Sequence, residues 1–370
     1  MAIYTMTFLI AEILAVIVSI KSKKENKKAV ELLVLGIIII LSLLGGLRGI
    51  TIGTDLRVYG ERWFNVAINS ESFSIYKKII NTTDIGYIFL NYIISRFTSN
   101  FNIYLFIHQL ICNGIVITVL YKCNKRVPFA ISLLCYLSFF YGRTFNLLRQ
   151  AIALSVVFYG ISNLIENKEK KFVVYILIAT LFHFTAVFSL IILPIKRICY
   201  SDNNRKKLYI FIIIIIAIIA TINIEPVVKF AYIHGIVNKR IYNYLFDFVN
   251  ISGKTFDFEL VFKTCFLLLV VLNSKKLKKI SKENYFLIIS IIIEFILFQI
   301  RYRIKYADRI SLYFGYQIML ILPQIIKTVK KGKDKLLLII IITVLLVIYW
   351  YYKFVHSGSC EIYPYRFFWE

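Results

Sequence analysis

The run Ala29-Val-Glu-Leu-Leu-Val-Leu-Gly-Ile-Ile-Ile-Ile-Leu-Ser-Leu-Leu-Gly-Gly-Leu47 continues directly into Arg48-Gly-Ile-Thr-Ile-Gly-Thr-Asp-Leu-Arg-Val-Tyr-Gly-Glu-Arg-Trp63. The first half is apolar over the length that a helix needs to cross a bilayer. The second half gathers charged residues and glycines just beyond the end of that helix. Because charge close to a bilayer is costly, the junction predicts either a binding site or a solvated loop at a helix mouth.

Apolar runs of the same kind recur along all 370 residues, of which 59% are hydrophobic, and the mean hydropathy is +0.74. We therefore expect an all-α polytopic membrane protein, with residues 1–370 forming a single transmembrane domain. The first run has no basic start and no small-residue cleavage site, so it is interpreted as a retained helix. The ten candidate spans are Ala2–Ile20, Ala29–Leu47, Ile103–Tyr121, Pro128–Gly142, Leu148–Ile165, Leu208–Ile224, Phe258–Asn273, Tyr285–Ile300, Ile310–Ile326 and Leu336–Tyr352.

Two further segments leave the topology open. Asp84–Phe97 is short and interrupted by polar residues, and Phe172–Ile195 is long enough for one crossing or for a re-entrant pair of half-helices. If the first is interfacial and the second re-entrant, the inner loops carry 26 Lys and Arg in 49 residues, against 18 in 121 outer residues. The positive-inside rule favours this arrangement. It places both termini outside and makes 48–100 and 225–256 the main extracytoplasmic loops.

The net charge of +25 is explained by these loops rather than by nucleic-acid binding. The six cysteines are scattered and show no spacing typical of a metal site or a disulfide framework, so we expect no metal and no cofactor. In the favoured topology 11 of the 14 arginines lie outside. Guanidinium groups bind phosphate through a rigid fork of donors, so this face suits a lipid-linked phosphate or pyrophosphate. The alternative is that the longer outer loops simply contain more arginine.

The second cluster, after the junction Arg48–Trp63, is Arg143, Arg149 and Gln150. Arg149 and Gln150 open a predicted helix, whose N-terminus presents free N–H groups and a positive dipole end to an anion. The alternative is that the arginines reach lipid headgroups. The outer loop 225–256 carries aromatic residues that suit sugar rings or, equally, the interfacial aromatic belt.

A single histidine, His183, lies in the middle of the long apolar run Phe172–Ile195. If that run is re-entrant, His183 sits at its turn and is reachable from outside. An imidazole there is a candidate base or hydrogen-bond donor, although a packing role is equally open.

The third cluster is Arg301-Tyr-Arg-Ile-Lys-Tyr-Ala-Asp-Arg309. Arg301, Arg303 and Arg309 concentrate positive charge between two apolar runs, and Asp308 is a candidate partner for one of them. Four cations in nine residues indicate an anion site more than an orientation signal.

In chain order, these landmarks resemble the EpsG family of Wzy-like polysaccharide polymerases. The matching stretches are Arg48-Gly, Gly53-Thr-Asp-Leu-Arg-Val-Tyr59, Asp84-Ile-Gly-Tyr, Arg149-Gln-Ala-Ile-Ala, Phe182-His-Phe-Thr-Ala, Asp308-Arg-Ile-Ser-Leu-Tyr-Phe and Tyr363-Pro-Tyr365. The family often has Glu where Asp84 stands. The resemblance implies a multi-pass bacterial plasma-membrane protein of capsule, exopolysaccharide or O-antigen synthesis, with a GT-C-like helical bundle and metal-independent glycosyltransferase activity. The implied partners are membrane lipid, undecaprenyl-pyrophosphate-linked oligosaccharide, and the flippase and chain-length regulator of the same pathway.

The chemistry of such a polymerase fits the candidate residues. A sugar hydroxyl of the next repeat unit displaces a lipid pyrophosphate, whose developing charge needs cations. Arg149 and one of the third-cluster arginines are expected there, with Arg48 and Asp55 shaping the site. The base is left open among His183, Asp55 and Asp84. The substrate-binding candidates are Arg48, Arg57, Arg143, Arg149, Gln150, Arg301, Arg303, Asp308 and Arg309.

Three other functions are weighed against the polymerase. A lipid-linked oligosaccharide flippase or other transporter needs charges near the midplane and related halves, whereas here the arginines lie at the outer mouths and no repeat is seen. A glycan ligase is not separable from a polymerase by sequence. A membrane acyltransferase needs an acidic residue close to its histidine in sequence, and His183 has none.

Overall fold

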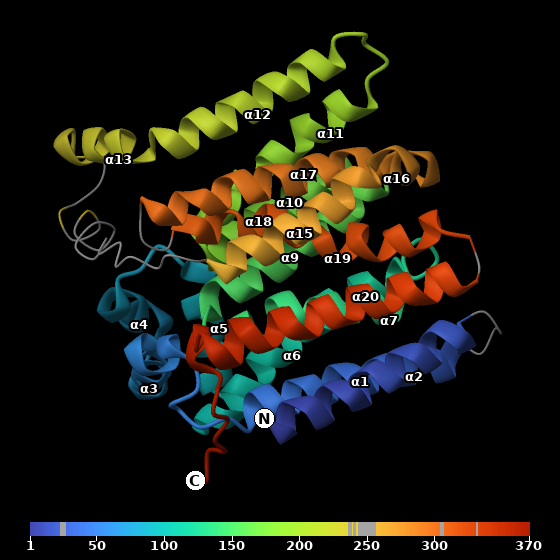
Figure 1. The fold of residues 1–370 in the computed structure, drawn as a ribbon. Helices are drawn as coiled ribbons and strands as arrows, with labels where there is room; N and C mark the ends of the chain where they lie inside the picture. Colours follow the sequence, from blue (N-terminus) through green and yellow to red (C-terminus); the bar gives the residue numbers. More distant parts are fainter. Residues whose placement is uncertain (23–26, 236–238, 240–241, 243–256, 304–306, 331) are drawn as a thin grey trace. The chain divides into compact units, whose positions relative to one another are not determined.

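The computed structural model describes the chain except for residues 23–26, 236–238, 240–241, 243–256, 304–306 and 331. The described residues are almost entirely helical, as expected for a polytopic helical membrane protein (Figure 1). By its contacts the chain divides into two compact units. Unit 1 comprises Met1–Val187 and Val329–Glu370, and unit 2 comprises Phe188–Thr328.

Unit 1 is a bundle of apolar helices with a group of short helices at one end. Its elements are α1 (Ala2–Lys21), α2 (Lys27–Gly46), the π-helical turn η1 (Leu56–Gly60), α3 (Glu61–Asn69), α4 (Phe73–Ile80), α5 (Ile85–Ser95), α6 (Phe101–Lys122), α7 (Phe129–Tyr136), the π-helical turn η2 (Leu137–Tyr141), α8 (Gly142–Thr144), α9 (Leu148–Ile165), α10 (Glu169–Phe182), α20 (Lys333–Trp350), the π-helical η7 (Tyr351–His356) and the 3₁₀ turn η8 (Ser359–Glu361). The 3₁₀ segment η3 (Phe184–Ile191) begins in unit 1.

The core of unit 1 forms around α9, which packs against α6 and α10 and is buried on almost every side. A helix that is apolar and buried all round is the expected centre of a membrane bundle. By contrast, α1 and α20 expose long rows of Leu, Ile and Val, as lipid-facing helices do.

The two ends of unit 1 are distinguished by contacts between distant residues. At one end, the Tyr4 hydroxyl donates to the Ile362 carbonyl at 2.7 Å, so both chain termini of the unit lie together (Figure 1). At the other end, the Asn124 amide donates to Ser22 Oγ at 2.9 Å, which joins two loops predicted to be cytoplasmic. The termini therefore share one side, and which side of the membrane that is stays a prediction.

Unit 2 is organised around α17 (Glu283–Phe298), which packs against α11, α12, α15, α16 and α18. Its other elements are α11 (Ile192–Tyr200), α12 (Lys206–Ile222), α13 (Ile224–Ile233), α15 (Phe258–Leu272), α16 (Ser274–Ile280), α18 (Leu312–Gly315), α19 (Ile318–Ile321) and the 3₁₀ turns η4 (Gln299–Tyr302), η5 (Ala307–Ile310) and η6 (Leu322–Thr328).

All ten predicted spans fall on helices, but fewer are long enough to cross a membrane alone. Within the described residues, 7 helices meet that length, and α12 with α13 makes an eighth if this pair, bent by 61°, counts as one span. The helix that runs from α7 through η2 to α8, and α15 with its 15 residues, fall short of 18 residues. Hydropathy therefore does not distinguish these shorter helices from those that meet the length.

The ambiguous and loop segments are more structured than the sequence indicated. Region 48–100 holds η1, α3, α4 and α5, and α5 is an apolar helix of 11 residues, too short to span alone. The long run 172–195 breaks at His183, whose backbone is extended with φ −157° and ψ 116°. The predicted loop 225–256 begins within α13, and its aromatic stretch 243–256 lies outside the described residues.

Candidate active site

Three segments that are distant in sequence meet at the end of unit 1 that holds both termini. The Gly49 N–H donates to the Arg366 carbonyl at 2.9 Å, and an isolated antiparallel bridge joins Arg48 to Phe367. The Asp55 N–H donates to Asn146 Oδ1 at 2.9 Å, which ties the first loop to the segment just before α9. The predicted outer segments 48–100, 141–149 and 353–370 therefore do share one end of the unit.

Arg149 is the centre of this site. It lies in the first turn of α9, as predicted, and its Nη1 is 2.6 Å from Asp84 Oδ2 at the start of α5. His183, directly after α10, places Nδ1 3.7 Å from the same carboxylate oxygen. The Asp84 side chain is only 5% exposed, whereas those of Arg149 and His183 are 28% and 24% exposed. Three candidates from separate parts of the chain are thus brought together, with the arginine and the imidazole partly exposed at the protein surface.

Two aromatic rings lie beside the Arg149 guanidinium. Its Cζ lies 4.6 Å from the Tyr59 ring centroid and 5.3 Å from that of Trp63. The Tyr59 hydroxyl donates to Asp55 Oδ2 at 2.5 Å, so Asp55 joins the same network. Tyr59 lies in the π-helical turn η1, and widened turns of this kind are frequent at functional sites.

Electrostatics keep the network in a defined protonation state. Burial raises the pKa of Asp84, but His183 and the positive Arg149 outweigh it, and the net pKa lies below the ordinary range. Burial, together with the nearby Asp55, raises the pKa of Tyr59 well above its ordinary value. Asp84 is therefore an ionised carboxylate at neutral pH, and Tyr59 keeps the proton that it donates to Asp55.

Arg48, at the start of the first loop, is wholly buried. Its guanidinium is 4.4 Å from the Phe145 ring centroid, and none of its three side-chain nitrogens has a hydrogen-bond partner among the described residues. Burial lowers its pKa to about 10, with nearby tyrosines, first Tyr141, acting in the opposite direction. Its backbone carbonyl accepts a 2.9 Å hydrogen bond from the Asn102 amide. The structure gives the Arg48 side chain no opening to solvent, and its role in shaping the site stays a prediction.

The other unit 1 candidates are Arg57, Arg143 and Gln150. Arg57 forms an ion pair with Glu361 near the chain's end, with both side chains about half exposed. Arg143 is largely buried, and its Nε donates to the Phe139 carbonyl along its own helix at 3.2 Å. Gln150 is buried in the first turn of α9, next to Arg149 in sequence.

In unit 2, Arg301 is held by two carboxylates that the sequence analysis missed. Its Nη1 is 2.9 Å from Glu259 Oε2, its Nη2 pairs with Asp257, and its Cζ lies 3.7 Å from the Phe298 ring centroid. Lys263 and Glu294 form a second, largely buried ion pair in this unit. The Asp257 and Glu259 carboxylates occupy N–H donors of Arg301 that a diphosphate would need.

The rest of the third cluster has less defined geometry. Arg303 is exposed just after η4. Asp308 and Arg309 lie in η5, where the Asp308 carbonyl accepts a 2.9 Å hydrogen bond from the Ser311 N–H. Lys305 lies outside the described residues.

Charged residues inside apolar runs were the overlooked signal for the missed groups. Glu259, Lys263 and Glu294 each interrupt a run that was assigned as a span, and such residues are functional or structural candidates by default. His108 in α6 is a similar case, since it is wholly buried with Nε2 2.8 Å from the Leu148 carbonyl. Among the residues that the structure describes, no group of three or more His, Cys, Asp or Glu side chains could hold a metal ion.

The fold and the site together define a polytopic helical membrane protein with an arginine–carboxylate–histidine centre at one end of its larger unit. Residues 31–367 match the EpsG family model, and the chain belongs to that family. Membership suggests a role like that of a polysaccharide polymerase. No curated protein and no solved structure matches the chain.

Proposed function

We propose that this protein joins undecaprenyl-pyrophosphate-linked oligosaccharide repeat units at the outer face of the bacterial plasma membrane, in capsule, exopolysaccharide or O-antigen synthesis. The observation that carries the proposal is the meeting of Arg149, Asp84 and His183, each from a stretch of family resemblance, at one partly open place. The flippase and the chain-length regulator of the pathway are proposed as further partners.

In the proposed reaction, a hydroxyl oxygen of the incoming repeat unit attacks the anomeric carbon of the growing chain. The bond from that carbon to the diphosphate oxygen breaks, and its electron pair leaves with the lipid diphosphate. Arg149 stabilises the developing charge, because a guanidinium has five N–H donors and Asp84 occupies only part of them. The Tyr59 and Trp63 rings restrict where that guanidinium can move. We propose that the positive charge that stabilises the leaving diphosphate comes from Arg149, without a metal ion or other cofactor.

His183 is the proposed base. A carboxylate whose pKa is lowered, as that of Asp84 is, holds a proton too weakly to take one from a sugar hydroxyl at neutral pH. Imidazole is the side chain that exchanges protons near neutrality. With Nδ1 toward Asp84, the other ring nitrogen of His183 accepts the hydroxyl proton, and the negative Asp84 stabilises the imidazolium that forms. Asp84 and Asp55 are then positioning residues, Asp55 through Tyr59.

The test is a deletion of the gene, followed by analysis of lipid-linked saccharides in the membrane. Loss of the polymerase leaves single repeat units on lipid at the outer face. Units trapped at the inner face would instead identify a flippase, and full-length polymer that stays on lipid would identify a ligase. Either of those outcomes overturns the proposal.

A further inference from the structure

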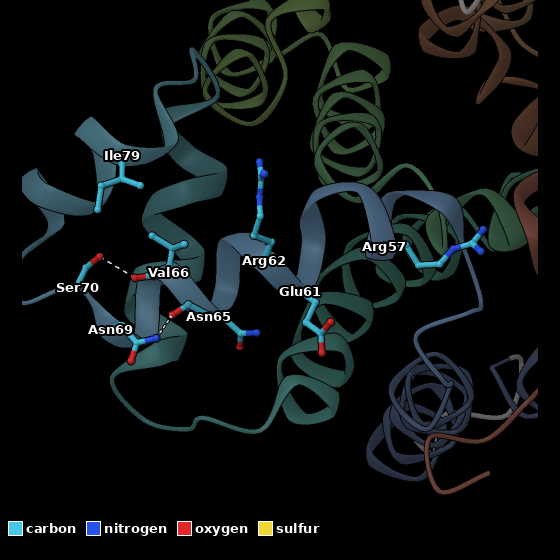
Figure 2. Close-up of a pocket in the computed structure, with 8 residues that line it drawn as sticks. All are labelled: Arg57, Glu61, Arg62, Asn65, Val66, Asn69, Ser70 and Ile79. Atoms are coloured by element: carbon cyan, nitrogen blue, oxygen red, sulfur yellow. Dashed lines mark hydrogen bonds between the residues drawn. The ribbon is translucent and has the colours of Figure 1, made fainter.

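A groove runs along α3 on the side of the helix that does not face Arg149. Its volume is about 480 Å³. Figure 2 shows the lining side chains, most of which come from η1 and α3, with Ile79 on the neighbouring helix α4. The lining residues are Arg57, Glu61, Arg62, Asn65, Val66, Asn69, Ser70 and Ile79.

The groove and the centre at Arg149 share one helix. The π-helical turn η1 continues into α3, and Tyr59 and Trp63, four residues apart, turn toward the Arg149 guanidinium. Glu61, Asn65 and Asn69 are also four residues apart and therefore form a second stripe along the helix. From Glu61 to Asn69 this stripe extends about 12 Å, since a helix rises 1.5 Å per residue. The helix formed by η1 and α3 therefore carries two rings that contact Arg149 and, on another side, a separate polar stripe.

The charges of the lining decide which ligand fits. Arg57 is paired with Glu361, and Glu61 offsets Arg62. The groove has no excess of positive charge and would attract a diphosphate poorly. Two Asn side chains both donate and accept hydrogen bonds, Glu61 accepts them and Arg62 donates them. Val66 and Ile79 add small apolar surfaces. This mixture matches a neutral saccharide, which has hydroxyl groups at its edges and C–H groups on its faces.

The far end of α3 is fixed in place, which suits a binding surface. Arg96 donates from Nη2 to the carbonyls of Ala67 and of Ile68, the second at 3.1 Å, and from Nη1 to that of Ser70 at 3.3 Å. Its guanidinium lies 4.6 Å from the Tyr92 ring centroid. A cation on the last carbonyls of a helix stabilises that end, so the groove keeps its shape without a ligand.

We propose that this groove is a saccharide subsite, which binds sugar residues of the repeat unit while the lipid diphosphate is held at Arg149. The inference rests on the proposed function, because it names where the carbohydrate part of the same substrate lies. The saccharide then lies on one side of α3, and the lipid diphosphate lies on the other side, at Arg149.

The test uses the full-length chain in lipid nanodiscs and two probes. The first probe is a set of oligosaccharides of one to three repeats, prepared by partial hydrolysis of the polymer secreted by cells that carry the gene. The second probe is inorganic pyrophosphate. The variants are Asn65→Ala and Glu61→Gln, with Ser74→Ala and Lys77→Ala on α4 as controls, because both control side chains are exposed and do not line the groove.

Each groove variant is expected to raise the Kd for the oligosaccharides by about 3- to 10-fold, the effect of one lost hydrogen bond, and to leave pyrophosphate binding unchanged. The control variants are expected to bind both probes like the original chain. Unchanged oligosaccharide affinity in both groove variants overturns the subsite. Weaker pyrophosphate binding in them overturns it as well, because the groove would then be an anion site.

Thermal melting of each variant shows whether a loss of binding comes from misfolding. The outcome is also separable from that of the proposed function. If deletion of the gene leaves chain lengthening intact while the groove variants still lose oligosaccharide affinity, the polymerase proposal fails and the saccharide subsite stands.

Discussion

Exchanging Arg149 for alanine separates a structural effect from a catalytic one, because its partner Asp84 can be changed too. The Arg149–Asp84 contact is 2.6 Å, and the Asp84 side chain is 5% exposed. Removing one member of a buried ion pair costs about 3–5 kcal/mol, because the other charge is left without compensation. Arg149 itself is 28% exposed, so the site is partly solvated and the lower figure applies. A loss of about 3 kcal/mol lowers the Tm by about 6–12 °C in a domain of some 200 residues.

The double variant Arg149→Ala with Asp84→Asn removes the uncompensated charge. Its Tm is expected to return most of the way to that of the original chain. Chain lengthening is expected to stay about 10²- to 10³-fold slower in both variants, because the cation at the leaving group is missing. The assays are thermal melting of purified protein in nanodiscs and polymer length on gels from complemented deletion cells. If polymer synthesis in the double variant recovers together with the Tm, Arg149 acts only in folding and the reasoning is refuted.

Four further outcomes are expected. His183→Ala slows chain lengthening by about 10²- to 10⁴-fold, the usual contribution of a general base, with little change in Tm; normal polymer yield in cells would remove it from the mechanism. Gly53→Ala lowers the Tm, because this residue has φ +98° and an added Cβ would lie 2.4 Å from a backbone carbonyl oxygen; an unchanged melting curve would contradict the backbone geometry. Arg301→Ala lowers the Tm more than Arg301→Lys, because Glu259 and its neighbouring carboxylate lose their cation; equal melting of the two variants would argue against that cluster. Because the pKa of Asp84 is lowered, its contribution to stability is complete above the ordinary carboxyl pKa of about 3.9 and is lost as the pH falls through the lowered value. Asp84→Asn is therefore expected to flatten the acid side of a curve of Tm against pH. An unchanged acid side would count against the Arg149–Asp84 pair.

The helices were predictable because their signal is local. Apolar runs set α1, α2, α6, α9 and α20 within a few residues, and the start of α9 placed Arg149 in its first turn. Hydropathy alone does not give the number of crossings, because α15 and the α7–α8 helix are apolar but shorter than 18 residues. Length in a bundle depends on where neighbouring helices end, and a sequence window does not contain that information.

The sequence indicated Asp84, Arg149 and His183 as candidate residues but did not predict how they pair in the structure. Arg149 was predicted at a helix start, His183 within a long apolar run and Asp84 as a candidate base, yet nothing in their spacing indicates that one carboxylate contacts both others. Such contacts depend on tertiary packing over 65 positions or more. The same limit explains why Arg301 seemed available for an anion while Asp257 and Glu259 in fact hold it. The contribution of Tyr59 depends on the widened turn η1, which has no simple sequence signature.

The pairing between the end of the chain and the first loop has a consequence for biosynthesis. The Tyr365 hydroxyl donates to the Leu44 carbonyl, 321 positions earlier. At about 5–20 residues per second, the ribosome needs roughly 15 to 60 s to make the intervening chain. During that time the loop beyond α2 is already made, but the segment around Tyr365 and Phe367 that packs against it and against Arg48 is still missing. We therefore expect the nascent protein to remain open to proteases at this loop until the segment around Tyr365 has left the ribosome.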